Sequence, residues 1–270
     1  MATTVTYKGA TLTTVDNQTK VLETAGTWME DDLTLVDVSG GGSDMLPTFI
    51  ANQQLGSYTF TDSYISDQQF REKKFTSLSL PNLVTSQKDN MFIQAVIGTL
   101  NLPSLKLCRN NYFQQLTIST LSLPNLETCG ASAFQQCTAS SLSLPKFVNA
   151  TGQTAFKWMT NLTEIDLPLC TTPGNWSFEG CTSLTKVDFG ALATLPQGIF
   201  NQCTALDVLI LRNQTMVSLT NINAFNNMNG KAVTVYVPSA LVSSYQNGTN
   251  WVSVTGATLT FTAIEGSIYE

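Results

Sequence analysis

A Leu-Pro pair recurs along the chain at nearly constant spacing, and this repeat constrains the fold more than any other feature. The pairs begin at Leu80, Leu102, Leu123, Leu144 and Leu167, so the spacings are 22, 21, 21 and 23 residues. Further steps of similar size reach Phe189, Leu211 and Val237, where an apolar residue is kept although only Val237 is followed by Pro. A period of about 20 to 50 residues is typical of solenoids, propellers and other repeat arrays.

Each unit carries the same apolar columns. The residues that lead to the Pro read L-x-x-L-x-L, as in Leu162, Ile165 and Leu167, and this alternation predicts a short strand with one side buried. The Pro ends the strand because it has no N–H to donate to a ladder. A phenylalanine follows 11 to 14 residues later, and the column consists of Phe92, Phe113, Phe134, Phe156, Phe178, Phe200 and Phe225.

These columns predict a β-rich solenoid of leucine-rich repeats, with 21–23 residues per repeat, about eight turns and a parallel sheet on one face. One repeat is too short to close its own core, so the phenylalanines should stack between turns as a buried spine. The predicted plan has a small N-terminal β module (1–39), a linker and N-terminal cap (40–57), a leucine-rich-repeat solenoid (58–230), and a last strand with the C-terminal cap (231–270). A weaker first unit is expected near Tyr58 and Phe60, and the Gly-rich run 40–43 is flexible by composition.

The repeat resembles the BspA-type leucine-rich repeat of bacterial surface and phage-associated proteins. Two units carry this resemblance: Leu121–Leu126 with Phe134–Cys137, and Leu162–Leu167 with Phe178–Cys181. The segment from Val235 onward, with Tyr245 and Trp251, is similar to the C-terminal cap of that family. The resemblance covers about residues 58 to 265 and implies a protein that works at a bacterial surface or on a phage.

Residues 1 to 38 have a different pattern. Val5–Leu12 and Leu33–Val38 alternate like strands. The segment between them, Lys20–Leu33, resembles a small module of tail-associated proteins from phages that infect gut bacteria. This second resemblance implies that the N-terminal module attaches the chain to other virion tail proteins.

Composition narrows the function. The chain has no histidine, which removes the commonest general base and the commonest metal ligand, so we expect neither an enzyme nor a metal or cofactor site. The net charge of −6 and the absence of a basic cluster argue against nucleic-acid binding. No apolar run reaches the length of a membrane span, and the N-terminus lacks a signal-peptide pattern. We therefore expect a protein made in the cytoplasm that works on a virion or an extracellular surface.

All six cysteines are expected to be reduced residues of the core. Four of them (Cys137, Cys170, Cys181 and Cys203) fall in inward columns of the repeat, where a thiol packs as a small hydrophobe. Cys108 and Cys129 align with each other and with Ser86 and Ala150 in a further packing column.

Two regions are candidates for ligand binding. The outward positions of the later strands carry Glu164, Asp166, Asp188 and Tyr236, whereas the earlier strands carry mostly small hydroxyls. Near the phenylalanine column, Trp158 and Trp176 offer aromatic surface of the kind that anchors partners. The alternative interpretations are that the C-terminal cap covers Val208, Ile210 and Tyr236, and that the tryptophans close the edge of the solenoid.

Asp166 and Asp188 also raise the question of a glycosidase-like carboxylate pair or, with Glu164, of a Ca²⁺ site. An open sheet has no pocket to raise one carboxyl pKa, and Lys186 stands beside the pair, so we expect neither. The amide side chains near the phenylalanine column could donate to saccharide hydroxyls, but we expect them to form a ladder that satisfies the backbone of the turns; they are Gln114, Gln115, Gln135, Gln136, Asn201, Gln202, Asn226 and Asn227.

The sequence thus predicts a non-enzymatic recognition module whose ligand is a bacterial surface glycan or protein. Three functions remain open: a phage tail-associated protein that binds its host, which we favour; a BspA-type bacterial adhesin; and a cell-wall glycan hydrolase, which the missing histidine disfavours.

Overall fold

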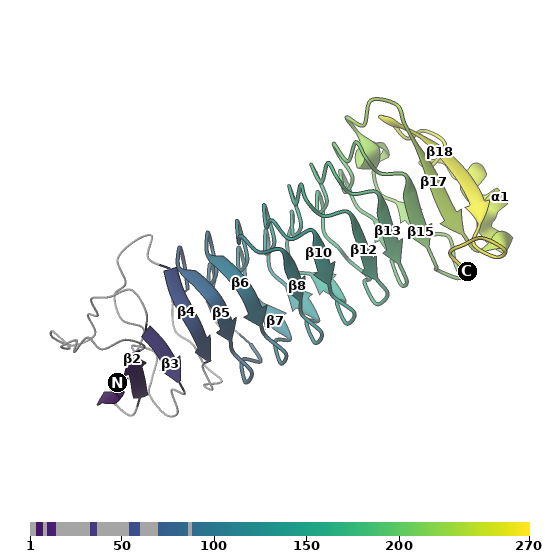
Figure 1. Cartoon of the computed structure of the whole chain (residues 1–270). Helices are drawn as coiled ribbons and strands as arrows, with labels where there is room; N and C mark the ends of the chain where they lie inside the picture. The colour runs from purple at the N-terminus through teal and green to yellow at the C-terminus, as the bar shows by residue number, and fades with distance from the viewer. Residues whose placement is uncertain (1–3, 8–9, 15–32, 37–53, 60–69, 86–87) are drawn as a thin grey trace.

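Short parallel strands, one per turn, form a continuous face along the molecule, as the repeat predicts. The computed structural model describes residues 4–7, 10–14, 33–36, 54–59, 70–85 and 88–270. Within them the face has nine successive strands, so the chain is a β-solenoid of about nine turns (Figure 1). The strands are β4 (Gln54–Thr59), β5 (Lys74–Ser79), β6 (Val96–Asn101), β8 (Thr120–Ser122), β10 (Ser141–Ser143), β12 (Glu164–Leu167), β13 (Lys186–Phe189), β15 (Val208–Leu211) and β17 (Lys231–Val237). The first turn belongs to β4, which contains Tyr58 of the expected weaker first unit and begins at Gln54, four residues before the predicted start of the solenoid.

A second, narrower side carries two-residue strands, each just after a turn that follows the main strand. They are β7 (Leu107–Cys108), β9 (Thr128–Cys129), β11 (Asn149–Ala150), β14 (Thr194–Leu195) and β16 (Ser218–Leu219). Cys108, Cys129 and Ala150 are register partners here, which confirms their predicted column; Ser86 lies outside the described residues. All six cysteines are free and buried.

The predicted phenylalanine spine runs through the core. All seven rings are buried, and neighbouring ring centroids from Phe92 to Phe225 lie 5.0 to 5.9 Å apart. Phe70 extends the stack by one turn, 5.1 Å from Phe92. Because every ring contacts the rings of the turns before and after it, no turn can be packed without its neighbours.

On the third side of the solenoid, residues next to the phenylalanine spine adopt the left-handed backbone conformation. From Phe92 to Phe200, the residues two before and two after each spine phenylalanine have positive φ, as Ser132 and Gln136 do around Phe134. From Phe92 to Phe178, the phenylalanine and both left-handed residues each donate their N–H to a carbonyl of the next turn. Phe134 N–H, for example, donates to the Ala155 carbonyl at 2.7 Å. We call this arrangement the donor ladder; it points every one of these N–H groups toward the C-terminal end.

The two ends of the chain depart from the repeat. The N-terminal residues form an antiparallel sheet of β1 (Thr4–Tyr7), β2 (Ala10–Thr14) and β3 (Leu33–Val36), so the predicted strand over 5–12 is divided between two antiparallel strands. The predicted joint at 40–43 lies outside the described residues.

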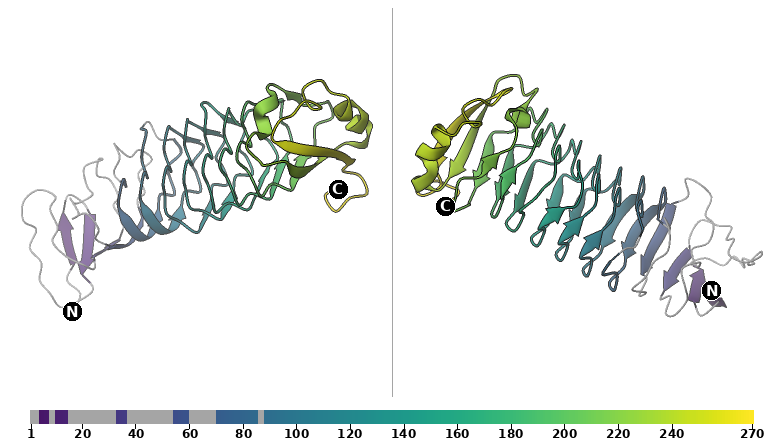
Figure 2. Two further views of the ribbon diagram at one scale, coloured as in Figure 1. Left: turned by 90° about the horizontal axis from the view of Figure 1, so that it is seen from above. Right: turned by 180° about the vertical axis from the view of Figure 1, so that it is seen from behind.

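The C-terminal end, shown from two sides in Figure 2, holds the described helices. They are η1 (Ile222–Phe225), η2 (Ser239–Leu241) and α1 (Val242–Gln246). A tenth strand, β18 (Ala257–Ala263), then pairs in parallel with β17 and ends the sheet.

Candidate functional site

Outward side chains form two columns along the strand face. The register pairs Ser79 with Asn101 and Asp166 with Asp188, so neighbouring turns place equivalent residues side by side as predicted. Exposure changes along this face. Eight outward residues of β6, β8, β10 and β12 are exposed: Thr99, Asn101, Thr120, Ser122, Ser141, Ser143, Glu164 and Asp166. We call these eight residues the open face.

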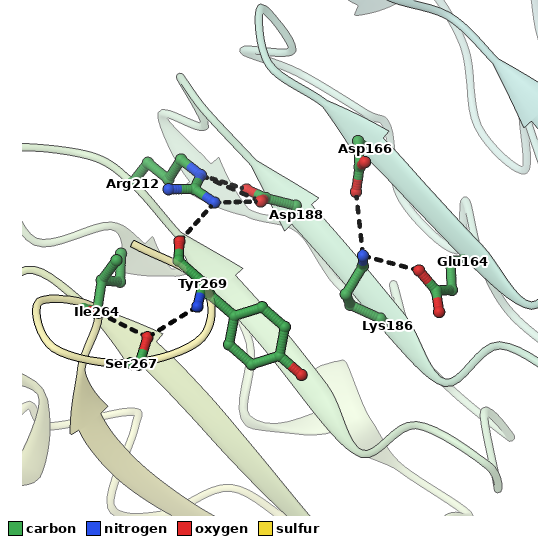
Figure 3. A network of polar contacts seen from close by, with 8 residues as sticks. All are labelled: Glu164, Asp166, Lys186, Asp188, Arg212, Ile264, Ser267 and Tyr269. Carbon is green, nitrogen blue, oxygen red and sulfur yellow. Dashed lines mark hydrogen bonds and ion pairs between the residues drawn. The ribbon is translucent and has the colours of Figure 1, made fainter.

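The acidic residues at one end of the open face are paired with cations (Figure 3). Lys186 Nζ lies 2.7 Å from Glu164 and 3.8 Å from Asp166. The hydrogen bond to Glu164 is the main reason why the pKa of Lys186 is raised. Arg212 holds Asp188 through two guanidinium nitrogens at 2.8 to 3.1 Å, and this contact raises the pKa of Arg212. Each carboxylate is therefore paired with a cation. We expected Lys186 to neutralise both Asp166 and Asp188, but it pairs with Glu164 and Asp166, and the partner of Asp188 is Arg212.

The C-terminal segment crosses the sheet beside Arg212. Figure 3 shows the Tyr269 carbonyl accepting a hydrogen bond from Arg212 Nη2 at 3.0 Å. The Tyr269 ring packs edge-on against Tyr236, with centroids 4.8 Å apart. Ile210 points outward from β15, yet it is only 1% exposed. Tyr236 thus packs against this segment, and Arg212 links Asp188 to it. That the cap also covers Val208 and Ile210 stays a prediction.

The two tryptophans both occupy left-handed positions beside the spine. Trp158 has φ 58° and Trp176 has φ 53°. A side chain at Gly180 would overlap the Trp158 ring, and one at Gly198 would overlap the Trp176 ring. Each indole thus lies over a glycine of the next turn. Trp176 is half-buried, whereas Trp158 is 39% exposed.

Polar ladders surround these indoles. Lys157 Nζ lies 4.3 Å from the centroid of the Trp158 ring and 2.7 Å from Glu179. Glu179 accepts from Asn201, which in turn accepts from Asn227. Earlier in the solenoid Gln115 donates to Gln136 at 3.0 Å. These amides therefore bond to side chains of neighbouring turns, whereas the sequence predicted that they satisfy the backbone of the turns. The contacts occupy donors that a ligand would otherwise use.

The structure thus separates the predicted site residues. Glu164 and Asp166 remain on the open face and Trp158 is accessible on another side, whereas Asp188, Tyr236 and Trp176 are engaged in packing or ion pairs. In the part of the chain that the structure describes, no group of three or more acidic or thiol side chains is arranged to hold a metal ion.

Sequence reasoning missed Arg212 and Tyr269. Arg212 stands where other repeats have Pro after the strand, and that break in the column was the available signal.

Comparison with known proteins identifies the repeat. The model of the BspA-type leucine-rich repeat region matches residues 63–139 and 127–247, in six copies. A solved structure of a leucine-rich cell surface protein from Faecalibacterium prausnitzii A2-165 is similar, with 14% identity, 98% of this chain and 96% of that chain covered, and a TM-score of 0.37. A search of curated proteins gave no significant match. None of the described helices has the length and apolarity needed to cross a membrane. The family match spans well over half of the sequence, and the chain belongs to the BspA-type leucine-rich repeat family.

Proposed function

We propose that this protein is a non-enzymatic recognition module that binds a partner at a bacterial surface through its open face. The observation that carries the proposal is the change in exposure along the sheet: the outward residues of β6 to β12 are exposed, whereas those of β13 to β17 are half-buried or buried. A face free of its own chain, on a rigid stack of turns, is where solenoid proteins commonly bind.

The chemistry of the open face favours a surface glycan over a folded apolar partner. Six of its eight residues carry an uncharged hydroxyl or amide, and hydroxyls both donate and accept hydrogen bonds. Adjacent strands repeat about every 4.8 Å, so a polymer of hydroxyl-bearing units would meet similar groups in successive turns. Glu164 and Asp166 give one end negative charge, which disfavours a phosphate-rich ligand.

We further propose that the module belongs to a phage tail, where residues 1–39 would attach it to other virion tail proteins. This assignment rests on the likeness of those residues to a tail-associated module. A BspA-type adhesin on a bacterial cell is the second candidate, and the family match favours it. Both candidates use the open face in the same way.

A matched pair of variants tests the open face. Ser143→Arg places a long cation at its centre and should abolish binding to a panel of labelled bacterial cells and arrayed surface polysaccharides. Asp166→Asn should weaken binding, while Glu127→Gln should not. Asp166 and Glu127 are both exposed acids with a lysine at 3.8 Å, but Glu127 precedes β9 on another side.

Melting temperatures must stay within a few degrees of the parent, since exposed ion pairs contribute only about 0–1 kcal/mol. Full binding by a folded Ser143→Arg variant would show that the open face is not the site. Trp158→Ser is then the next variant to measure, because Trp158 is the exposed aromatic among the described residues.

A further inference from the structure

The last strand of the solenoid, β18, has an open edge. It pairs with β17 on one side, and among the described residues no backbone hydrogen bond reaches its other side. Its sequence, Ala-Thr-Leu-Thr-Phe-Thr-Ala, contains no charge and no proline. Edge strands of soluble proteins are usually short, charged or interrupted by proline, because an open edge pairs with other chains. A seven-residue edge without these features is suited to pairing.

Two hydrogen bonds show which residues point to the open edge. Gly256 accepts from Gly230, and Ile264 donates to Val237, so the even-numbered residues of this segment face β17. A strand alternates the direction of its backbone groups, and Ala257, Leu259, Phe261 and Ala263 therefore direct both N–H and C=O outward.

A groove runs along this edge. It has a volume of about 460 Å³, and one wall is the strand itself from Ala257 to Phe261. Trp251, Val252 and Val254 line the other side. Val252 is 61% exposed, although it is apolar, and Leu259 and Phe261 are only half-buried. Phe261 packs against Tyr245 and Trp251, so the open backbone edge and the exposed Val252 are what this groove offers to a partner.

The side-chain pattern of β18 is the same in both directions about Thr260. Thr258 and Thr262 lie on the outward face on either side of it, Leu259 and Phe261 on the inward face, and an alanine stands at each end. We propose that two copies of this chain pair through β18, antiparallel and about a two-fold axis through Thr260. The inference does not depend on the proposed function.

This register satisfies the geometry of an antiparallel sheet. Leu259 would stand opposite Phe261 of the second copy, and Ala257 opposite Ala263. These are the residues with outward backbone groups, so each pair would exchange two hydrogen bonds, roughly eight in total. Thr260 would face its own copy at a non-hydrogen-bonded position, where side chains approach most closely. Neither strand carries a charge, so no like charges would oppose each other.

The axis fixes how the dimer presents its surfaces. A two-fold axis perpendicular to the sheet places both open faces on the same side of one longer sheet. A single strand pair buries a small area, and the dimer should therefore be weak and concentration-dependent.

Charge variants at the axis test the pairing in the full chain. The parent should show a reversible monomer–dimer equilibrium by sedimentation velocity at up to about 0.2 mM. Thr260→Lys and Thr260→Glu should each be monomeric, because like charges would meet at the axis, and a mixture of the two should dimerise again. Thr120→Lys, which alters an exposed outward threonine in the middle of the sheet, should leave the equilibrium unchanged.

Cross-linking tests the register independently. The six natural cysteines are buried, so a new surface thiol can be read alone. Mild oxidation should give a disulfide-linked dimer of Thr260→Cys, whereas Thr258→Cys and Thr262→Cys should cross-link only when mixed. Thr120→Cys should stay monomeric.

A parent chain that remains monomeric at 0.2 mM overturns the proposal, and this includes the case in which the edge accepts a strand of another protein. Dimers that survive Thr260→Lys, or that cross-link through Thr258→Cys alone, contradict the pairing about Thr260.

Discussion

The residue that fits at a position of the repeat depends on the space that the next turn leaves beside it. Trp158 and Trp176 fit into columns that elsewhere hold Gln, Asn, Ser or Thr, because Gly180 and Gly198 leave room beside them. The pairing has two parts: a left-handed backbone that suits glycine, and an empty space that the indole fills. In these two left-handed columns, each tryptophan is therefore matched by a glycine one turn later.

We predict that Gly180→Ala destabilises the protein more than Gly230→Ala. Both glycines have a φ above 70°, so each alanine pays the left-handed penalty of about 1–2 kcal/mol. A Cβ at Gly230 meets nothing within 4 Å, whereas one at Gly180 overlaps Trp158. The measurement is the free energy of unfolding in urea. Equal losses for the two variants would mean that the indole does not pack on Gly180.

The buried thiols predict a loss of stability in alkaline solution. Burial raises the pKa of Cys137 to about 11 and those of Cys170 and Cys181 to about 12, compared with 9.0 for a free thiol. Above pH 9 the unfolded chain ionises these thiols and the folded chain does not, so stability falls as pH rises. Between pH 8 and pH 10 each such thiol should cost about 1.4 kcal/mol.

Cys181→Val isolates this effect from the titration of lysines and tyrosines. The unfolding free energy of this variant should fall less than that of the parent over the same pH range. In native protein at pH 8 the thiols should also be unreactive toward a thiol reagent, and six should react after unfolding. Parallel pH profiles of parent and variant would contradict the burial of the Cys181 thiol.

At the scale of elements, the C-terminal segment after β18 completes the sheet face. Its contacts are unevenly distributed: Tyr269 packs on Tyr236 and accepts a hydrogen bond from Arg212, whereas the neighbouring Ile268 is 90% exposed. Near its end, the segment thus contacts the sheet through Tyr269 and not through Ile268.

We predict that Tyr269→Ala lowers the free energy of unfolding by about 1–3 kcal/mol, because it removes the aromatic contact with Tyr236 and exposes that ring. Ile268→Ala should change the stability by less than about 0.5 kcal/mol, since the side chain is already in solvent. Binding of a fluorescent hydrophobic dye should rise only for Tyr269→Ala. A similar effect of both variants would show that Tyr269 does not hold the segment on the sheet.

How much of the structure was predictable differs between the elements. The strands, the spine and the cysteine columns follow from local periodicity, because each turn repeats the same contacts about 22 residues later. The Arg212–Tyr269 contact joins residues 57 positions apart and occurs once, so no repeat revealed it. Likewise, β18 was assigned to the cap because its threonines lie beyond the last Leu-Pro-like unit. The strand register alone predicts that Glu164 and Asp166 point outward. The environment of their neighbour Asp188 was not predictable in this way, because it depends on the ion pair with Arg212.

At the scale of the whole molecule, the solenoid has contacts mainly between adjacent turns, so its parts should be separable. We predict that a chain of residues 44–270 still folds as a solenoid, because the stacked turns from β5 onward keep their own contacts, although the contacts between β3 and β4 are lost. It should retain binding to bacterial cells, while residues 1–39 alone should not bind. Binding that follows residues 1–39 would reverse the roles assigned to the two parts.

The donor ladder has a consequence for how such chains change length. Within the donor ladder, every turn from Phe92 to Phe178 donates N–H groups to the turn after it and accepts with its carbonyls from the turn before it. An in-frame duplication or loss of one unit in the gene therefore recreates the same junction on both sides. Each such event would lengthen or shorten the rod by about 4.8 Å without disturbing the fold. Recombination can thus change the length of this solenoid by whole repeats.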